Sequence, residues 1–171
     1  MNIELCITKS ANGDEGAFKE LFDHLNDRLF RYALARTRSR DEALDVVQQT
    51  FIDLWEQLDR FTYSSDPQFY QYIYLILKRR IGKLYRRQAH VSLDEMSFEG
   101  VYEMDVYSED ELRTVLATMQ KLKGSYREIL HLRHWSGLSF KEIAGVMGGT
   151  ESSVRVTHHR ALESLKAKMP H

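Results

Sequence analysis

The sequence has few of the residues that cross-link a chain or interrupt its helices. Cys6 is the single cysteine, so an internal disulfide and a zinc site built from cysteines are both excluded. There are only two prolines, Pro67 and Pro170, and no alternating apolar and polar run that would indicate strands. Apolar residues still make up 43% of the chain, which is enough for a core. We therefore predict an all-α fold made of two small helical domains.

Long apolar segments and catalytic motifs are also missing. The absence of a signal-peptide pattern and of a membrane-length apolar run predicts a cytoplasmic protein without membrane insertion. There is no phosphate-binding glycine loop, nucleophile elbow or recognisable pair of catalytic carboxylates, so we expect neither an enzyme nor a cofactor. His131 and His134 lie three residues apart, and His158 and His159 are adjacent. Adjacent helical residues diverge and no carboxylate or thiol completes a set, so we expect no metal site.

Charge is strongly segregated, although the formal net charge is only -1. Residues 78–90 hold six Lys or Arg and no acid, whereas residues 88–112 hold eight acids and no Lys or Arg. From residue 113 onward, ten Lys or Arg face four acids. This pattern indicates two modules that face nucleic acid, joined by an acidic connector. The alternative is that the charged runs only keep helices solvated.

Helix signals in the first half predict four helices. One follows Asn12 or Asp14 as its N-cap, and a second covers about residues 27–38. A third covers residues 41–55, and the fourth begins at Pro67 with Asp66 as its cap. The third helix has a stripe that we expect to be buried, formed by Ala43, Val47, Phe51, Leu54 and Leu58. Its opposite face, with Thr50 at the margin, is formed by Asp45, Gln48, Gln49 and Ile52.

Capping boxes mark three helix starts in the second half. They pair Ser108 with Glu111, Ser125 with Glu128, and Ser139 with Glu142. After Gly148 and Gly149, Thr150 caps a last helix that runs to about residue 168. The segment "LSFKEIAGVMGGTESSVRVTHHRALESL" is thus a helix, a glycine turn and a helix, typical of a helix-turn-helix that enters the major groove. An ordinary helical hairpin is the alternative.

That segment resembles region 4.2 of bacterial sigma factors, which reads the minus-thirty-five promoter element. The matching residues include Leu138, Ser139, Glu142, Ile143, Ala144, Gly148, Val154, His159, Arg160, Ala161 and Leu165. The chain departs from the family at Thr157 and His158. Upstream, "LATMQKLKGSYREILHLRHWSGLS" resembles region 4.1. The resemblance implies minus-thirty-five DNA contacts by Ser152, Ser153, Arg155, His159 and Arg160.

The stretch "DEALDVVQQTFIDLW" resembles region 2.2, which docks on the clamp coiled coil of the polymerase beta-prime subunit. The resemblance implies clamp contacts by Asp45, Gln48, Gln49 and Ile52. The stretch "DRFTYSSDPQFYQYIYLILKRRIGKLYRR" resembles regions 2.3 and 2.4, which handle the minus-ten element. A melted strand needs aromatic faces for its bases and cations for its phosphates. The implied minus-ten residues are Phe61, Tyr63, Lys78, Arg79, Arg80, Lys83, Arg86 and Arg87.

These resemblances together imply an alternative sigma factor of the extracytoplasmic-function (ECF) group. The implied layout is a region 2 domain (1–90), an acidic linker (91–107) and a region 4 helix-turn-helix domain (108–171). Its expected partners are core RNA polymerase, through the beta-prime clamp and the beta flap, and the promoters of a stress- or signal-specific regulon. A free-standing helix-turn-helix regulator, which needs no polymerase, is the alternative.

Region 2.2 has fewer acids than the family pattern. Leu44 and Gln49 stand where relatives usually carry acids. Phosphorylation would add roughly -1.5 to -2 charges near neutral pH. Thr50, and secondly Thr62, are therefore candidates for modification by a Ser/Thr protein kinase. Control by an anti-sigma factor, with Thr50 an ordinary boundary residue, remains the alternative.

Overall fold

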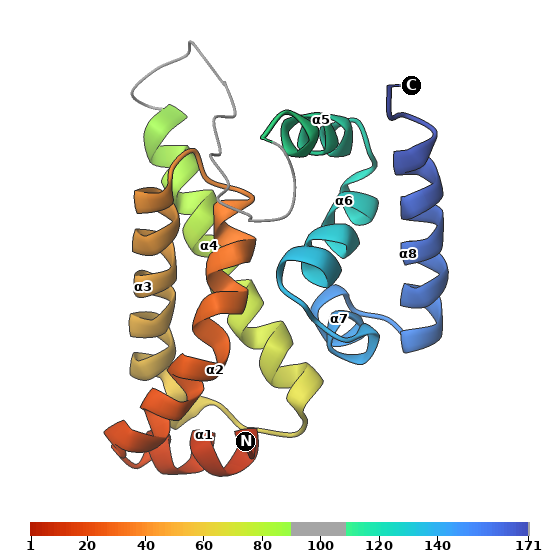
Figure 1. Ribbon diagram of the computed structural model, residues 1–171. Coiled ribbons are helices and arrows are strands. Elements are labelled where there is room, and N and C mark those ends of the chain that lie inside the picture. The colour runs from red at the N-terminus through yellow and green to blue at the C-terminus, as the bar shows by residue number, and fades with distance from the viewer. Residues whose placement is uncertain (90–108, 171) are drawn as a thin grey trace.

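A computed structural model describes residues 1–89 and 109–170, with side chains for residues 1–87 and 114–170. Ser108 and the whole of the predicted acidic linker (91–107) thus lie outside the described residues. The described part contains helices and no strand, so the all-α prediction is confirmed. Helices α1 to α4 form the first half and helices α5 to α8 the second (Figure 1). No helix within these two ranges is both long and apolar enough to cross a membrane.

The first half has four α-helices, but two of them differ from the prediction. The predicted helices on either side of residue 26 are one helix, α2 (Glu15–Leu34). Their separation was wrong because a stripe of fully buried side chains continues through the expected break: Leu21, Leu25, Leu29 and Tyr32. An unpredicted helix, α1 (Ile3–Ala11), precedes them, and the Asn2 side chain caps it by accepting the Leu5 N–H at 3.0 Å. Gly13, with a φ of 85°, turns the chain into α2.

Helix α3 (Arg40–Gln57) has the predicted stripe. Ala43, Val47, Phe51 and Leu54 are all at most 5% exposed. A short 3-10 turn (Leu58–Arg60) and an extended loop lead to α4 (Asp66–Ala89), which continues through Gly82.

The expected cap of α4 was placed one residue too late. Asp66 is already helical, and its carboxylate accepts the Tyr63 hydroxyl at 2.6 Å. The Ser65 hydroxyl instead accepts the backbone N–H of Gln68, in the first turn of α4, at 3.4 Å. Asp66 therefore holds the preceding loop instead of capping the helix.

The second half contains α5 (Glu109–Gln120), α6 (Gly124–Leu130), a π-helical turn (His131–Trp135), α7 (Phe140–Met147) and α8 (Glu151–Lys166). The capping box of Ser139 and Glu142 is confirmed, and so is the Thr150 cap. The box at Ser125 is wrong: Lys123 occupies the cap position of α6 without a side-chain hydrogen bond. Glu128 was not available for that box because its carboxylate points to residues of the first half.

The two halves pack directly against each other. Helix α7 lies on α4, and buried residues of both halves form one continuous hydrophobic cluster. Figure 1 shows α3 and α8 at opposite sides of the molecule, with α4 and α7 between them. The helix-turn-helix therefore packs on α4, the helix for which the sequence predicted minus-ten binding.

Candidate protein and nucleic-acid interfaces

The outer face of α3, formed by Asp45, Gln48, Gln49 and Ile52, is exposed to solvent. Ile52 is 44% exposed and places an apolar side chain among the polar ones of this face. We call these four residues the α3 face. The structure brings all four onto one surface, as the sequence predicted, and leaves it uncovered by the described residues.

Thr50 does not lie at the margin of the α3 face. Its side chain is 0% exposed, and its hydroxyl donates to the carbonyl oxygen of Val46 at 2.7 Å. The expected position was wrong because α2 and α4 both pack on α3 and widen its buried stripe. A kinase has no access to this hydroxyl while α3 is folded. Thr62, by contrast, is exposed in the loop before α4.

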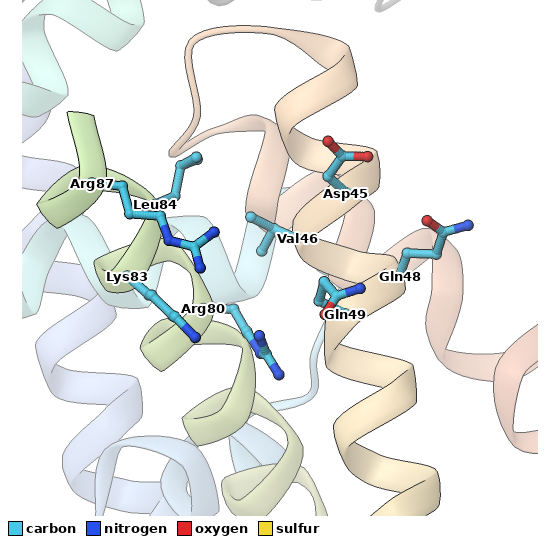
Figure 2. Close-up of a pocket in the computed structure, with 8 residues that line it drawn as sticks. All are labelled: Asp45, Val46, Gln48, Gln49, Arg80, Lys83, Leu84 and Arg87. Carbon is cyan, nitrogen blue, oxygen red and sulfur yellow. The ribbon is translucent and has the colours of Figure 1, made fainter. Parts of the chain in front are cut away.

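A groove between α3 and α4 joins the α3 face to the basic cluster of α4. It is lined by Asp45, Gln48 and Gln49 from one helix and by Arg80, Lys83 and Arg87 from the other. Figure 2 shows the α4 cations reaching toward α3. Arg80 is paired within the domain, because its Nε donates to Asp53 at 2.5 Å and its second nitrogen contacts the same carboxylate. Arg80 is thus held as part of the wall of the groove.

The aromatic residues near the start of α4 divide into a core set and a surface set. Tyr70 and Tyr74 are almost completely buried. Phe61 and Tyr72 are only partly buried, and their rings stack with centroids 4.7 Å apart and planes at 27°. With Val146 of α7 they line a shallow groove at the junction of the two halves. This stacked pair offers a flat aromatic surface, and Tyr72 was not among the residues assigned to minus-ten DNA.

Not all basic residues of α4 are available to bind the phosphates of DNA. Arg79, Lys83, Arg86 and Arg87 are exposed. Lys78, however, lies at the junction of the halves, where its ammonium group is 2.7 Å from the Glu128 carboxylate. The predicted minus-ten cluster therefore consists of an open part along the outer end of α4 and one member, Lys78, whose charge is paired with a carboxylate of the second half.

Helix α8 carries the predicted minus-thirty-five residues on its outer surface. Ser152, Ser153, Arg155, His159 and Arg160 are all exposed, whereas Val154 and Ala161 are buried against the rest of the second half. The Ser153 hydroxyl donates to the Thr150 carbonyl oxygen at 2.8 Å and accepts the Thr150 N–H, so it is used in the cap. This geometry fits a recognition helix that enters a major groove with its N-terminal half.

His134 and His158 form an imidazole pair that links the π-helical turn to α8. Their Nε2 atoms are 2.9 Å apart, and the two rings stack. Burial, followed by the neighbouring charges, lowers the pKa of both rings. At neutral pH one ring can donate to the other, which fixes the turn against the recognition helix.

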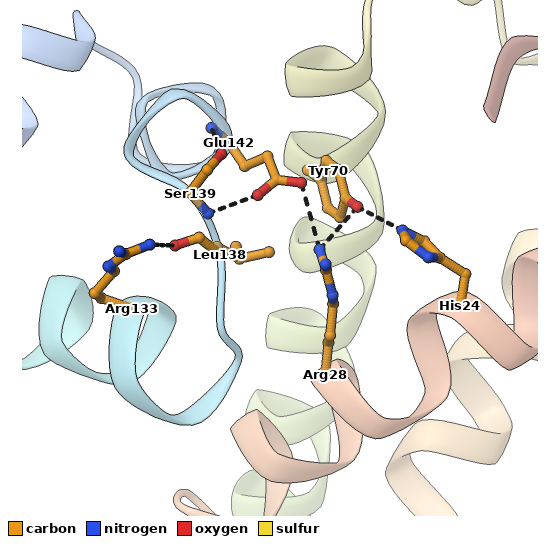
Figure 3. Close-up of polar contacts among 7 residues, drawn as sticks. All are labelled: His24, Arg28, Tyr70, Arg133, Leu138, Ser139 and Glu142. Atoms are coloured by element: carbon orange, nitrogen blue, oxygen red, sulfur yellow. Dashed lines mark hydrogen bonds and ion pairs between the residues drawn. The ribbon is translucent and has the colours of Figure 1, made fainter. Parts of the chain in front are cut away.

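Sequence reasoning missed the polar residues that join the halves. Figure 3 shows one group of them: Arg28 of α2 lies between the Tyr70 hydroxyl, at 3.0 Å, and the Glu142 carboxylate, at 3.3 Å. His24 contacts the same Tyr70 hydroxyl at 2.9 Å. The Arg28–Glu142 partners are 114 positions apart in the chain, so no local pattern could reveal them.

Comparison with protein families gives two matches, in the same order as the two halves. The model of sigma-70 region 2 matches residues 21–91, and the model of sigma-70 region 4 matches residues 112–165. The chain belongs to the ECF group of sigma-70 factors. We therefore call its first half region 2 and its second half region 4.

Individual relatives align with nearly the whole of this sigma factor. The ECF RNA polymerase sigma factor BldN of Streptomyces coelicolor is 26% identical over 96% of the chain, which spans 64% of the length of BldN. SigD of Mycobacterium tuberculosis is 27% identical over 96% of the chain and 82% of its own length. Among solved structures, CnrH in complex with the cytosolic domain of CnrY superimposes with a TM-score of 0.68. That match has 26% identity and covers 95% of this chain and 94% of CnrH.

Proposed function

We propose that this protein is an alternative sigma factor that binds core RNA polymerase and directs it, in the cytoplasm, to the promoters of a stress- or signal-specific regulon. The exposed α3 face is the single observation that carries the proposal. An exposed face that mixes polar and apolar side chains suits a protein interface better than bare solvent. In the family this helix docks on the clamp coiled coil of the beta-prime subunit, and we assign the same contact here.

Minus-ten recognition is assigned to the loop before α4 and to the outer end of that helix. Bases of a melted strand stack on exposed aromatic rings, and the stacked rings of Phe61 and Tyr72 supply such a surface. Exposed cations such as Lys83 and Arg87 then bind the phosphates. Arg80 acts as a support for this surface, because Asp53 already holds its guanidinium group.

Minus-thirty-five recognition is assigned to α8. Arginine donates to guanine edges or to phosphates in the major groove, and Arg155 and Arg160 are placed on the outer surface of the helix for this purpose. The beta flap of the polymerase is the partner that the family assigns to region 4.

Two kinds of regulator fit this sigma factor. CnrH, its structural relative, was solved in complex with the cytosolic domain of CnrY, and we propose that an anti-sigma factor likewise binds this chain. For control by a Ser/Thr protein kinase, Thr62 is the remaining candidate, since its hydroxyl is on an exposed loop.

The polymerase contact is tested by replacing the apolar residue of the α3 face with a charged one. We expect Ile52→Arg to weaken binding to core polymerase by at least about tenfold, because a charged side chain replaces the apolar contact at the proposed interface. Gln49→Glu, which restores the acid usual in the family, should strengthen binding. Binding is measured by biolayer interferometry with immobilised core polymerase, and run-off transcription gives the functional readout.

Leu5→Arg is the matched control, because Leu5 is 50% exposed on α1 and lies outside the α3 face. It should bind core polymerase like the wild type. Equal binding by Ile52→Arg and Leu5→Arg would exclude the α3 face as the docking site. Tight operator binding by the isolated chain, without any polymerase association, would instead favour a free-standing helix-turn-helix regulator.

A further inference from the structure

Helix α8 has two exposed large apolar side chains, and one of them lies within the predicted recognition surface. They are Val156, which is 47% exposed, and Leu162, which is 38% exposed. Successive residues of an α-helix are about 100° apart, so Leu162 lies roughly 120° around the helix axis from Val156. The two side chains therefore face different surroundings, and each needs its own explanation.

The nearest neighbours of Val156 on the helix surface are all residues predicted to contact the minus-thirty-five element. Residues three and four positions apart lie side by side on an α-helix. For Val156 these positions hold four exposed residues: Ser152, Ser153, His159 and Arg160. Val156 itself was not among the predicted contacts, although it lies at the centre of the surface that they form.

Side-chain length around Val156 suits entry into a major groove. Ser152 and Val156, one turn apart, have short side chains, and the longer cationic side chains of Arg155 and Arg160 lie on either side of them. A recognition helix places its central side chains against base edges, while cations at its margins bind phosphates. The short central side chains allow α8 to approach the bases closely, which brings Val156 to the floor of the groove.

Glu163 limits the part of α8 that can lie deepest in the groove. Its side chain is 67% exposed, and its carboxylate is 3.4 Å from the His159 imidazole, one turn beyond Val156. A carboxylate is repelled by the phosphates that line the groove. The N-terminal half of α8, which contains Val156, is therefore the half that fits against the bases.

Neither packing within the chain nor helix stability accounts for a valine at this position. The buried side of α8 is formed by Val154 and Ala161, which are 5% and 0% exposed. Valine is a weaker helix former than alanine, lysine or arginine, because its branched side chain loses rotamer freedom in a helix. A contact outside the chain explains the exposed valine better than its local structure does.

The chemistry of valine leaves one feature of the major groove that it can recognise. Its side chain has no hydrogen-bond donor or acceptor, so it cannot pair with the polar base edges. The apolar feature of the groove is the C5 methyl group of thymine, which small apolar side chains contact. A polar base edge beneath the valine would lose its water without gaining a hydrogen bond. Val156 thus favours thymine and disfavours the other bases at the position that it covers.

We propose that Val156 is a specificity-determining residue of α8, and that it reads the C5 methyl group of a thymine in the minus-thirty-five element. This inference rests on the function proposed above and adds to it the chemical group that one promoter position must carry. Ser152 and Arg160, on either side of Val156, hydrogen-bond to the polar edges of the neighbouring base pairs.

The test removes the methyl group from the DNA and the isopropyl group from the protein, separately and together. Holoenzyme formed from this chain and core polymerase first selects its preferred minus-thirty-five sequence from a randomised duplex pool. Each thymine of that sequence, on either strand, is then replaced singly by uracil, which lacks only the C5 methyl group. Binding is measured by the anisotropy of a fluorescent duplex. At one thymine we expect uracil to weaken wild-type binding roughly fourfold, the size expected for one buried methyl group.

Val156→Ala supplies the protein side of this double-mutant cycle. The replaced side chain is exposed and alanine is the better helix former, so α8 should keep its fold. The variant should bind the thymine duplex roughly fourfold more weakly, and its preference for thymine over uracil at that position should fall below about twofold. Leu162→Ala is the matched control, because it removes an exposed apolar side chain from another side of the same helix. It should keep both the affinity and the preference.

The outcomes separate this contact from the proposed function. Equal thymine-to-uracil ratios for wild type and Val156→Ala at every position would overturn the role of Val156. Loss of the preference in Leu162→Ala as well would also overturn it, because the effect would then arise from α8 as a whole. Failure to bind core polymerase would instead count against the proposed function. The selection and the duplex cycle are then carried out with the isolated chain, so the methyl contact is decided in either case.

Discussion

The α3 face and the minus-ten face of α4 belong to the same domain, but one is open and the other is partly covered. All four residues of the α3 face are exposed, whereas Lys78 is bound to Glu128 and the first turn of α4 lies under Gly145. Under the proposed function, the α3 face is open to the polymerase clamp in this arrangement, whereas region 4 occupies part of α4.

The largest expected difference is between substitutions on the two faces of α3, measured by their effect on the free energy of unfolding. Leu54 is 0% exposed and Ile52 is 44% exposed on the same helix. We expect Leu54→Ala to lower the free energy of unfolding by about 3 kcal/mol, because it leaves a cavity in the core. Ile52→Ala should change it by less than about 0.5 kcal/mol. Urea unfolding followed by circular dichroism measures both, and similar losses would mean that the α3 face is packed in solution.

Acid should lower the free energy of unfolding through the buried His131. Burial, followed by Arg36, lowers the pKa of His131 to about 3, and its side chain is only 2% exposed. Between this value and the unfolded pKa of about 6.5, only the unfolded chain takes up the proton, so stability falls as the pH falls. From pH 7 to pH 5 we expect a loss of about 2 kcal/mol.

His131→Leu should make that dependence less steep, since the most strongly shifted imidazole is removed. Urea unfolding at pH 7 and pH 5 gives the comparison between wild type and variant. An equally steep pH dependence in the variant would assign the loss to other groups.

Removal of the Thr50 hydroxyl should have a smaller effect. Its single hydrogen bond stays within α3, so Thr50→Val should change the free energy of unfolding by no more than about 1 kcal/mol. Core polymerase binding should be unchanged, because the side chain does not reach the α3 face. A marked loss of polymerase binding by a stably folded Thr50→Val would show that this hydroxyl does become accessible.

The smallest expected effect distinguishes the open and covered cations of α4. Lys83→Ala should reduce the salt dependence of binding to a single-stranded minus-ten oligonucleotide by about 0.7 in the slope of log K against log salt. Lys78→Ala should reduce it by less, because Lys78 is paired with the Glu128 carboxylate in this arrangement and therefore neutralises no phosphate. Equal slopes for the two variants would indicate that Lys78 is as available as Lys83.

Local patterns were sufficient for much of the fold and of both candidate interfaces. The period of apolar residues placed the buried stripe of α3, and therefore also the residues of the α3 face. Capping residues located the start of α7 and α8, and the glycine pair located the turn between them. These features depend on residues within one or two helical turns of each other.

The features that were missed depend on contacts across the chain. Glu128 fits a capping box in the sequence, yet it pairs with Arg36, 92 positions away. Thr50 is buried because α4 also packs on α3, which no periodicity within α3 can reveal. The predicted break in α2 failed for a similar reason, since tertiary burial of Leu25 and Leu29 outweighs the weak helix preference of Asn26 and Asp27.

Arg155 of α8 is already held in place when no DNA is bound. Its guanidinium group donates to Glu151 at 2.5 Å and lies 4.7 Å from the centroid of the Phe140 ring, which Arg133 approaches at the same distance. An arginine that is fixed before binding avoids an entropy loss of about 0.5–1.5 kcal/mol when it meets its target. In the proposed minus-thirty-five contact, Phe140 would thus add to the affinity for DNA without touching it, because it limits the motion of Arg155.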